Sequence, residues 1–256
     1  MTMSVVLDVS VHSGYGSPIH CVLKLYDPGF GSALRDILEG KPAPCTQENE
    51  AAFQALVAQG LMPGFLRDLE KRNETQQLPV AAWQFLEDEP DRIEGLAKFD
   101  AALWHDCFDH FECVTQGYNR LADLQGKVVP RLLSHVSLTP NTKPTVNRPR
   151  EEASYFDIRG ILLERIDGYC LEDLTGSPLP SNLTSWQRII QSAADAAHEI
   201  HKRGIIIRDC TPRIIDLAQC HLRDELVKRW YKHGWDEDED WGPDVEYWEQ
   251  VYTASN

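Results

Sequence analysis

The chain has 256 residues, of which 42% are hydrophobic, enough for one domain of two lobes or for two small domains. Its 40 acidic residues against 25 basic ones argue against non-specific binding to nucleic acid or to an anionic membrane surface. No apolar run approaches the roughly 18 residues of a membrane helix, and the N-terminus lacks the basic-then-apolar order of a signal peptide. The seven cysteines include no C-x-x-C, which favours a reducing compartment, cytoplasmic or nuclear.

The first predicted element is a strand at 21–26, C-V-L-K-L-Y, with one lysine at its middle. Because side chains alternate along a strand, Lys24 is expected on the face opposite Leu23 and Leu25. A lysine at such a position is either an exposed strand residue or a cation that reaches into a phosphate site. A glycine-bearing segment, 13–17, precedes this strand, but two strands to flank it hardly fit in the residues available.

A stretch rich in acidic residues follows at 31–101, with helical patterns at 48–61 and 81–86 and a polar segment at 70–77. Directly after it, histidine, aspartate and cysteine crowd together at 105–110. These are metal-ligand types. The spacing of His105 and Asp109 beside aromatic residues nevertheless favours the polar face of an amphipathic helix.

Three further elements are predicted downstream. A helix around 111–121 is indicated by apolar residues at helical spacing, is ended by Gly126 and is followed by an extended stretch from 128. A buried strand at 161–164 leads to a turn at 167–168. A helix at 185–203, with cap signals at 182–185 and at Gly204, carries one apolar stripe. The stripe comprises Trp186, Ile189, Ile190, Ala193, Ala197 and Ile200.

The segment 203–220, R-G-I-I-I-R-D-C-T-P-R-I-I-D-L-A-Q-C, contains two aspartates that each follow an apolar, strand-like run. Taken alone, Asp209 and Asp216 could end two ordinary buried strands. However, R-D-x-x-P followed by I-I-D-L-A resembles the catalytic loop and the metal-binding aspartate of a phosphoryl-transfer site.

The order of these elements, a strand lysine, a helix, a hinge, an amphipathic helix, an R-D loop and then I-D-L-A, resembles a protein kinase. The spelling L-x-x-L-Q-G-x-x-V-P-R-L at 121–132 resembles divergent fungal kinase-like proteins. The resemblance implies an α+β, two-lobe kinase-like fold with a helical insertion and a truncated C-lobe. The N-lobe and hinge would span 1–166 with the insertion at 31–101, the partial C-lobe 167–230, and a mobile acidic tail 231–256.

The resemblance also implies roles for individual residues. Asp209 would orient or deprotonate the acceptor hydroxyl, Asp216 would hold Mg²⁺, and Lys24 would hold the phosphates of ATP. In the hinge, Leu163 would occupy the gatekeeper position. The carbonyl of Glu164 and the N–H of Ile166 would face the adenine.

Several residues depart from the kinase pattern. Ile214 stands where an asparagine should bind metal, and the interval from Asp209 to Asp216 is much shorter than in the family. Val114 stands where the helix glutamate is expected, and Glu112 lies two residues away. No A-P-E-like element follows. We therefore expect a weak or inactive ATP-dependent phosphotransferase, a pseudokinase.

Two alternatives remain. One is a non-catalytic interaction or scaffold protein that binds an unknown protein partner through its acidic insertion or tail. The other, with less support, is a small-molecule kinase of the aminoglycoside or choline type. That class also expects the asparagine that Ile214 replaces.

Overall fold

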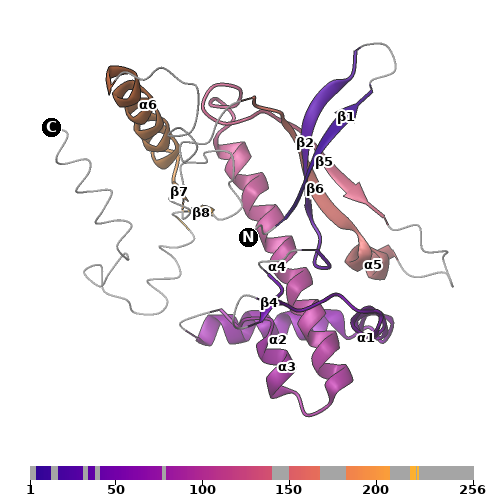
Figure 1. Ribbon diagram of the computed structural model, residues 1–256. Helices are drawn as coiled ribbons and strands as arrows, with labels where there is room; N and C mark the ends of the chain where they lie inside the picture. Colours follow the sequence, from indigo (N-terminus) through magenta and orange to yellow (C-terminus); the bar gives the residue numbers. More distant parts are fainter. Residues whose placement is uncertain are drawn as a thin grey trace.

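The computed structural model of the chain describes residues 4–12, 17–30, 34–37, 41–76, 79–139, 150–167, 183–207, 220–222 and 224. Its strands are β1 (Val5–Val11), β2 (Ile19–Tyr26), β3 (Asp36–Ile37), β4 (Lys41–Pro42), β5 (Leu132–Leu138), β6 (Ile158–Glu164), β7 (Ile205–Ile207) and β8 (Cys220–Leu222). Its helices are α1 (Gln47–Ala58), α2 (Met62–Thr75), α3 (Gln84–Asp88), α4 (Arg92–Arg120), α5 (Arg150–Ala153), the short turn η1 (Ser154–Phe156) and α6 (Leu183–His201). Figure 1 shows their arrangement.

A four-stranded antiparallel sheet in the order β1-β2-β6-β5 forms one layer of the molecule. Strand β1 pairs with β2 along its whole length, so the segment 13–17 is flanked by β1 and by the lysine-bearing strand itself. Among the described residues, β1 is the one strand that precedes the lysine strand. Residues 13–16 lie outside the described residues. The α+β class is confirmed by this sheet and the helices around it.

The insertion forms a helical layer at one end of the sheet (Figure 1). The predicted helical patterns at 48–61 and 81–86 correspond to α1 and α3. The side chain of Thr46 caps α1 by accepting a hydrogen bond from the backbone N–H of Asn49 at 3.2 Å. Of the polar segment predicted at 70–77, residues 70–75 form most of the second half of α2. Leu69 is the one buried side chain in the second half of α2. A surface helix needs only a narrow apolar stripe to pack against its neighbours.

Helix α4 is one continuous helix, which corrects the predicted boundary between the insertion and a separate helix starting near 111. It begins inside the insertion because Asp91 caps it, accepting hydrogen bonds from the backbone N–H groups of Ile93 at 2.8 Å and Glu94 at 3.1 Å. Buried residues recur along α4 every three or four positions without a break, so the same face of the helix packs against the core along its length. The recurring residues are Phe99, Leu103, Cys107, Phe111, Val114 and Tyr118.

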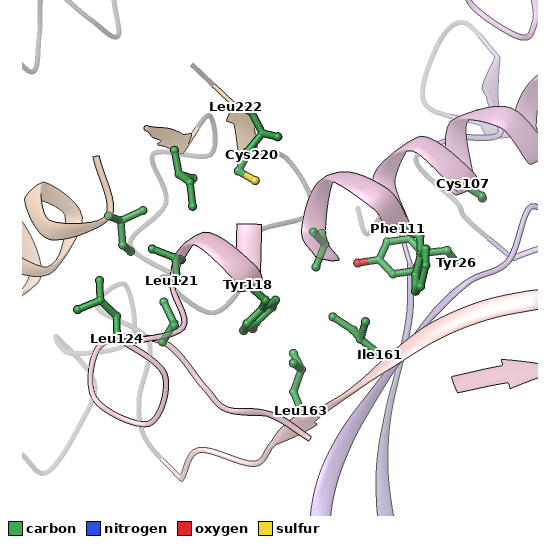
Figure 2. Close-up of a cluster of buried hydrophobic side chains, with 14 residues drawn as sticks. Tyr26, Cys107, Phe111, Tyr118, Leu121, Leu124, Ile161, Leu163, Cys220 and Leu222 are labelled. Carbon is green, nitrogen blue, oxygen red and sulfur yellow. The ribbon is translucent and has the colours of Figure 1, made fainter. Parts of the chain in front are cut away.

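The main core lies between the sheet and the second half of α4. Figure 2 shows Ile161 and Leu163 of β6 facing the side chains of α4, with Tyr26 of β2 beside Phe111. The rings of Tyr26 and Phe111 meet edge to face, with centroids 5.9 Å apart. The same cluster includes side chains from α6, β7 and β8, namely Ile200, Ile205, Cys220 and Leu222.

A buried arginine fastens the insertion to the end of β2. The guanidinium of Arg35 is almost fully buried and donates hydrogen bonds to the carbonyls of Ala43 and Pro28, both at 2.8 Å. It also lies 3.1 Å from a carboxylate oxygen of Asp100 on α4. Burial raises the pKa of Asp100 above its ordinary value, although Arg35 acts in the opposite direction. The buried Arg35–Asp100 ion pair thus connects α4 to the segment that follows β2.

Helix α6 runs as predicted, and Gly204 follows it with a φ of +72°, a left-handed conformation that favours glycine at a helix end. The apolar stripe predicted for this helix is not buried along its whole length, because Ile190 in the middle of α6 is 60% exposed. Among residues 187–201 of α6, whose side chains are described, Ile200 alone lies fully in the core. Among the described elements, β7 is the main neighbour of α6. No described helix has the length and apolarity needed to cross a membrane.

Candidate functional site

Lys24 is buried at the middle of the sheet, with 5% of its surface exposed. It lies directly opposite Ile161 of β6 and Val6 of β1. Its strand neighbours on the same face, Val22 and Tyr26, pack into the core against α4. The lysine is therefore on the sheet face that α4 covers. The first of the two alternatives, an exposed strand residue, is excluded.

Leu163 and Glu164 end the strand that pairs with the lysine strand. Leu163 is fully buried in the core and lies opposite Val22 of β2. Glu164 is anchored to Arg131: its backbone N–H donates to the carbonyl of Arg131 at 2.9 Å, and its carboxylate lies 3.2 Å from the guanidinium. Ile166, beyond the strand end, is half exposed. The three predicted hinge residues thus follow one another at the edge of the core that holds Lys24.

The acidic residue nearest the expected position on α4 is engaged elsewhere. The carboxylate of Glu112 lies 3.3 Å from the guanidinium of Arg159 on β6. That guanidinium also lies over the ring of Phe108, 4.4 Å from its centroid. Val114 is buried in the core between α4 and the sheet. Helix α4 therefore presents an apolar side chain where a kinase-like site would need a carboxylate.

Asp209 and Asp216 lie outside the described residues, but the strands on either side of their segment are described. β7 and β8 pair antiparallel, with Ile207 opposite Cys220. In the sequence, both aspartates fall between these two strands.

The β7–β8 hairpin is docked on the second half of α4. Figure 1 shows α4 running between the sheet and this hairpin. The Sγ of Cys113 on α4 donates to the carbonyl of Cys220 at 3.0 Å, and the two sulfurs are 3.7 Å apart. Arg120, at the end of α4, lies 3.0 Å from the carboxylate of Asp224. Strand β8 and the lysine strand β2 therefore both pack against α4.

The cluster at 105–110 lies on α4. His105 lies 3.4 Å from Asp109 one turn later, the polar-face arrangement that the spacing predicted. Among the described residues, no group of three or more histidines, cysteines or carboxylates is placed to hold a metal ion.

A groove in the helical layer was not predicted from the sequence. It has a volume of about 740 Å³ and lies between α1, α2, α3 and the first turns of α4. No local motif marks it, because its lining comes from four helices that only the tertiary fold brings together. Its apolar members follow the same helical periodicity as ordinary core residues.

Comparison of the chain with protein-family models, with curated proteins and with solved structures returned no match. Function is therefore inferred from the residues and their placement.

Proposed function

We propose that this chain is a degenerate protein kinase-like protein of ATP-dependent phosphotransferase ancestry, with a weak or inactive nucleotide site. One observation carries the proposal: the segments that would build such a site all contribute to a single core. The lysine strand contributes Tyr26, the hinge strand Leu163, and the strands around the aspartate segment Ile205 and Cys220. Helix α4 lies between them and contributes Tyr118.

In this proposal, Lys24 neutralises the nucleotide phosphates from the centre of the sheet. Glu164 and Ile166 offer backbone groups to the adenine, with Leu163 behind them as the gatekeeper. Asp216 supplies a carboxylate for Mg²⁺, and Asp209 orients the acceptor hydroxyl. Phosphoryl transfer depends almost entirely on such positioning and on charge neutralisation. The kinase-like, two-lobe arrangement with a truncated C-lobe is part of this proposal.

Loss of activity is proposed because two positions of the kinase pattern hold apolar residues. Val114 is an apolar core residue where the resemblance expects a glutamate, and Glu112 is paired with Arg159. Ile214 supplies no metal ligand, whereas a working site has an asparagine there. Weak nucleotide binding can persist with one lysine and one metal aspartate. Efficient turnover needs the second metal ligand.

Binding of Mg-ATP should be tested by thermal unfolding of the wild-type chain and of Asp216→Ala. If Kd is about 0.1 mM, ligand at a hundredfold excess over Kd stabilises the fold by about 2.7 kcal/mol. For a chain of this length that corresponds to roughly 5–10 °C in Tm. We expect the shift to require Mg²⁺ and to be lost in Asp216→Ala. The Asp68→Ala variant, which removes an exposed carboxylate on α2, is the matched control and should keep it.

Two further variants separate the assigned roles. Lys24→Met removes the phosphate contact, and its own Tm without ligand reports any loss of folding. Asp209→Asn should leave nucleotide binding intact, because Asp209 is assigned to the acceptor and not to ATP. No Mg²⁺-dependent shift in the wild type at several millimolar ATP would refute a surviving nucleotide site.

A further inference from the structure

The groove in the helical layer has an apolar floor and an opening to solvent. Figure 1 shows α1, α2, α3 and the first turns of α4 gathered at one end of the molecule. Buried or half-buried side chains form the floor, and two large apolar residues at the opening, Leu61 and Ile93, are each 50% exposed. The floor residues are Ala52, Leu56, Phe65, Leu69, Phe85 and Ala97.

The groove exists because the helical layer has two separate small cores instead of one. One core is centred on Phe85, Phe99 and Leu103, and the other on Phe53 and Met62. The groove floor draws on both cores, and Phe65 packs against each of them. Continuous helical layers normally close such a seam by packing side-chain ridges into grooves. Here the seam is left with space for the apolar face of another helix.

Small residues let a backbone approach this seam closely. Gly64 and Ala97 lie in the lining, and Ala55 contributes an exposed methyl group from the last turns of α1. Helix-in-groove recognition uses this kind of surface, in which an amphipathic helix inserts side chains at i, i+3, i+4 and i+7. A volume of about 740 Å³ is enough for several such side chains.

The charge of the residues around the groove favours a positively charged partner. Four acidic residues line it, Asp68, Glu89, Asp91 and Glu94, against two basic ones. Of the basic residues, Lys98 is held by the carboxylates of Glu89 at 2.5 Å and Glu94 at 2.7 Å. The other, Arg72, lies over the ring of Phe85, 5.1 Å from its centroid. The lining is therefore net acidic around an apolar floor.

We propose that this groove is a docking site for a basic amphipathic helix of a protein partner. The apolar face of that helix would lie between α1, α2 and the start of α4, and its lysines or arginines would face Asp68, Asp91 and Glu94. The inference goes beyond the proposed nucleotide site and does not depend on it. Charge complementarity of this kind mainly sets specificity and association rate.

The test uses two fluorescein-labelled synthetic helices with leucine at i, i+3, i+4 and i+7. One has lysine at the flanking positions and the other glutamate, and binding to the full chain is measured by fluorescence anisotropy. We expect the lysine peptide to bind with a Kd of about 10–100 μM. We expect the glutamate peptide to bind at least about tenfold more weakly. Raised salt should weaken the first interaction.

Two matched variants locate the site. Ala55→Lys puts a long basic side chain into the groove, whereas Ala58→Lys puts the same side chain on an exposed part of α1 outside the lining. Ala55 and Ala58 both lie near the C-terminal end of α1, where a lysine is well tolerated. Circular dichroism checks that both variants fold. Ala55→Lys should weaken binding of the lysine peptide by about tenfold or more, and Ala58→Lys should leave it within about twofold.

Three results would overturn the proposal. One is no binding of the lysine peptide up to about 1 mM. A second is equal binding of the two peptides, or equal effects of Ala55→Lys and Ala58→Lys. A third is concentration-dependent dimerisation in light scattering that Ala55→Lys abolishes, which would assign the groove to a second copy of the chain. A nucleotide shift without peptide binding, or the reverse, separates this proposal from the proposed function.

Discussion

Replacing Asp106 with asparagine should stabilise the protein, and increasingly so as the pH rises. Asp106 lies on α4, where burial, with a smaller contribution from the charge of Asp109, raises its pKa from the ordinary value of 3.8 to about 7. The folded protein therefore prefers the protonated carboxyl, and the unfolded chain ionises it freely. Asparagine has nearly the same shape and carries no charge at any pH.

The sign and size follow from proton linkage. Because the folded-state pKa lies above the unfolded one, the favourable contribution of Asp106 is fully present below about pH 4 and is lost as the pH rises through about 7. A shift of this size corresponds to at most about 4 kcal/mol, at roughly 1.4 kcal/mol per pH unit. Between pH 5 and pH 8, the advantage of Asp106→Asn over the wild type should grow by about 2–3 kcal/mol.

Denaturant unfolding of the two proteins at pH 5, 6, 7 and 8 measures this difference directly. Asp109→Asn, which removes an exposed carboxylate one turn away, is the control and should lower the pH dependence only slightly. A difference between wild type and Asp106→Asn that stays constant from pH 5 to pH 8 would show that the carboxyl is hydrated in the folded protein, and the reasoning from burial would fail.

Two further predictions test the packing around α4. Gly95→Ala should destabilise the fold by about 1–3 kcal/mol, because a Cβ there would lie 2.8 Å from the backbone oxygen of Phe85. Gly64→Ala, with open space around it, should be neutral or stabilising by up to about 1 kcal/mol, and thermal melts compare the two. Mild oxidation with copper phenanthroline should join Cys113 to Cys220, whose sulfurs are 3.7 Å apart, as mass spectrometry of peptides would detect. Absence of that linked peptide would contradict the docking of β8 on α4.

Local patterns predicted a large part of the secondary structure. The alternation around Lys24, the helical spacing within 48–61 and the cap signals at the end of α6 depend on residues close together in the chain. Such patterns decide strand or helix before any tertiary contact forms. The helix at 111–121 was found for the same reason. The helix starts at Arg92, within the stretch assigned to the insertion, and Asp91 before it is a recognisable N-cap residue.

Only part of the candidate site could be predicted from the sequence. The residue types and their order suggested Lys24, the hinge residues, Asp209 and Asp216 as one site. The tertiary structure decided that Lys24 is buried beside β6 and that the hairpin around the aspartate segment is attached to α4. The two aspartates lie outside the described residues, so their roles stay predictions, as does the role of the acidic tail at 231–256.

Residues close together in the chain specify most strands and helices, their apolar faces, and the residue types that can do phosphate and metal chemistry. Three features became visible only in the fold: which strands are neighbours, the pairing of Glu112 with Arg159, and the acidic-rimmed groove that four helices leave between two cores. This division reflects the range of the interactions. Strand and helix patterns arise from contacts a few residues apart, whereas strand order, ion pairs across elements and unfilled seams arise from contacts between residues far apart in the chain.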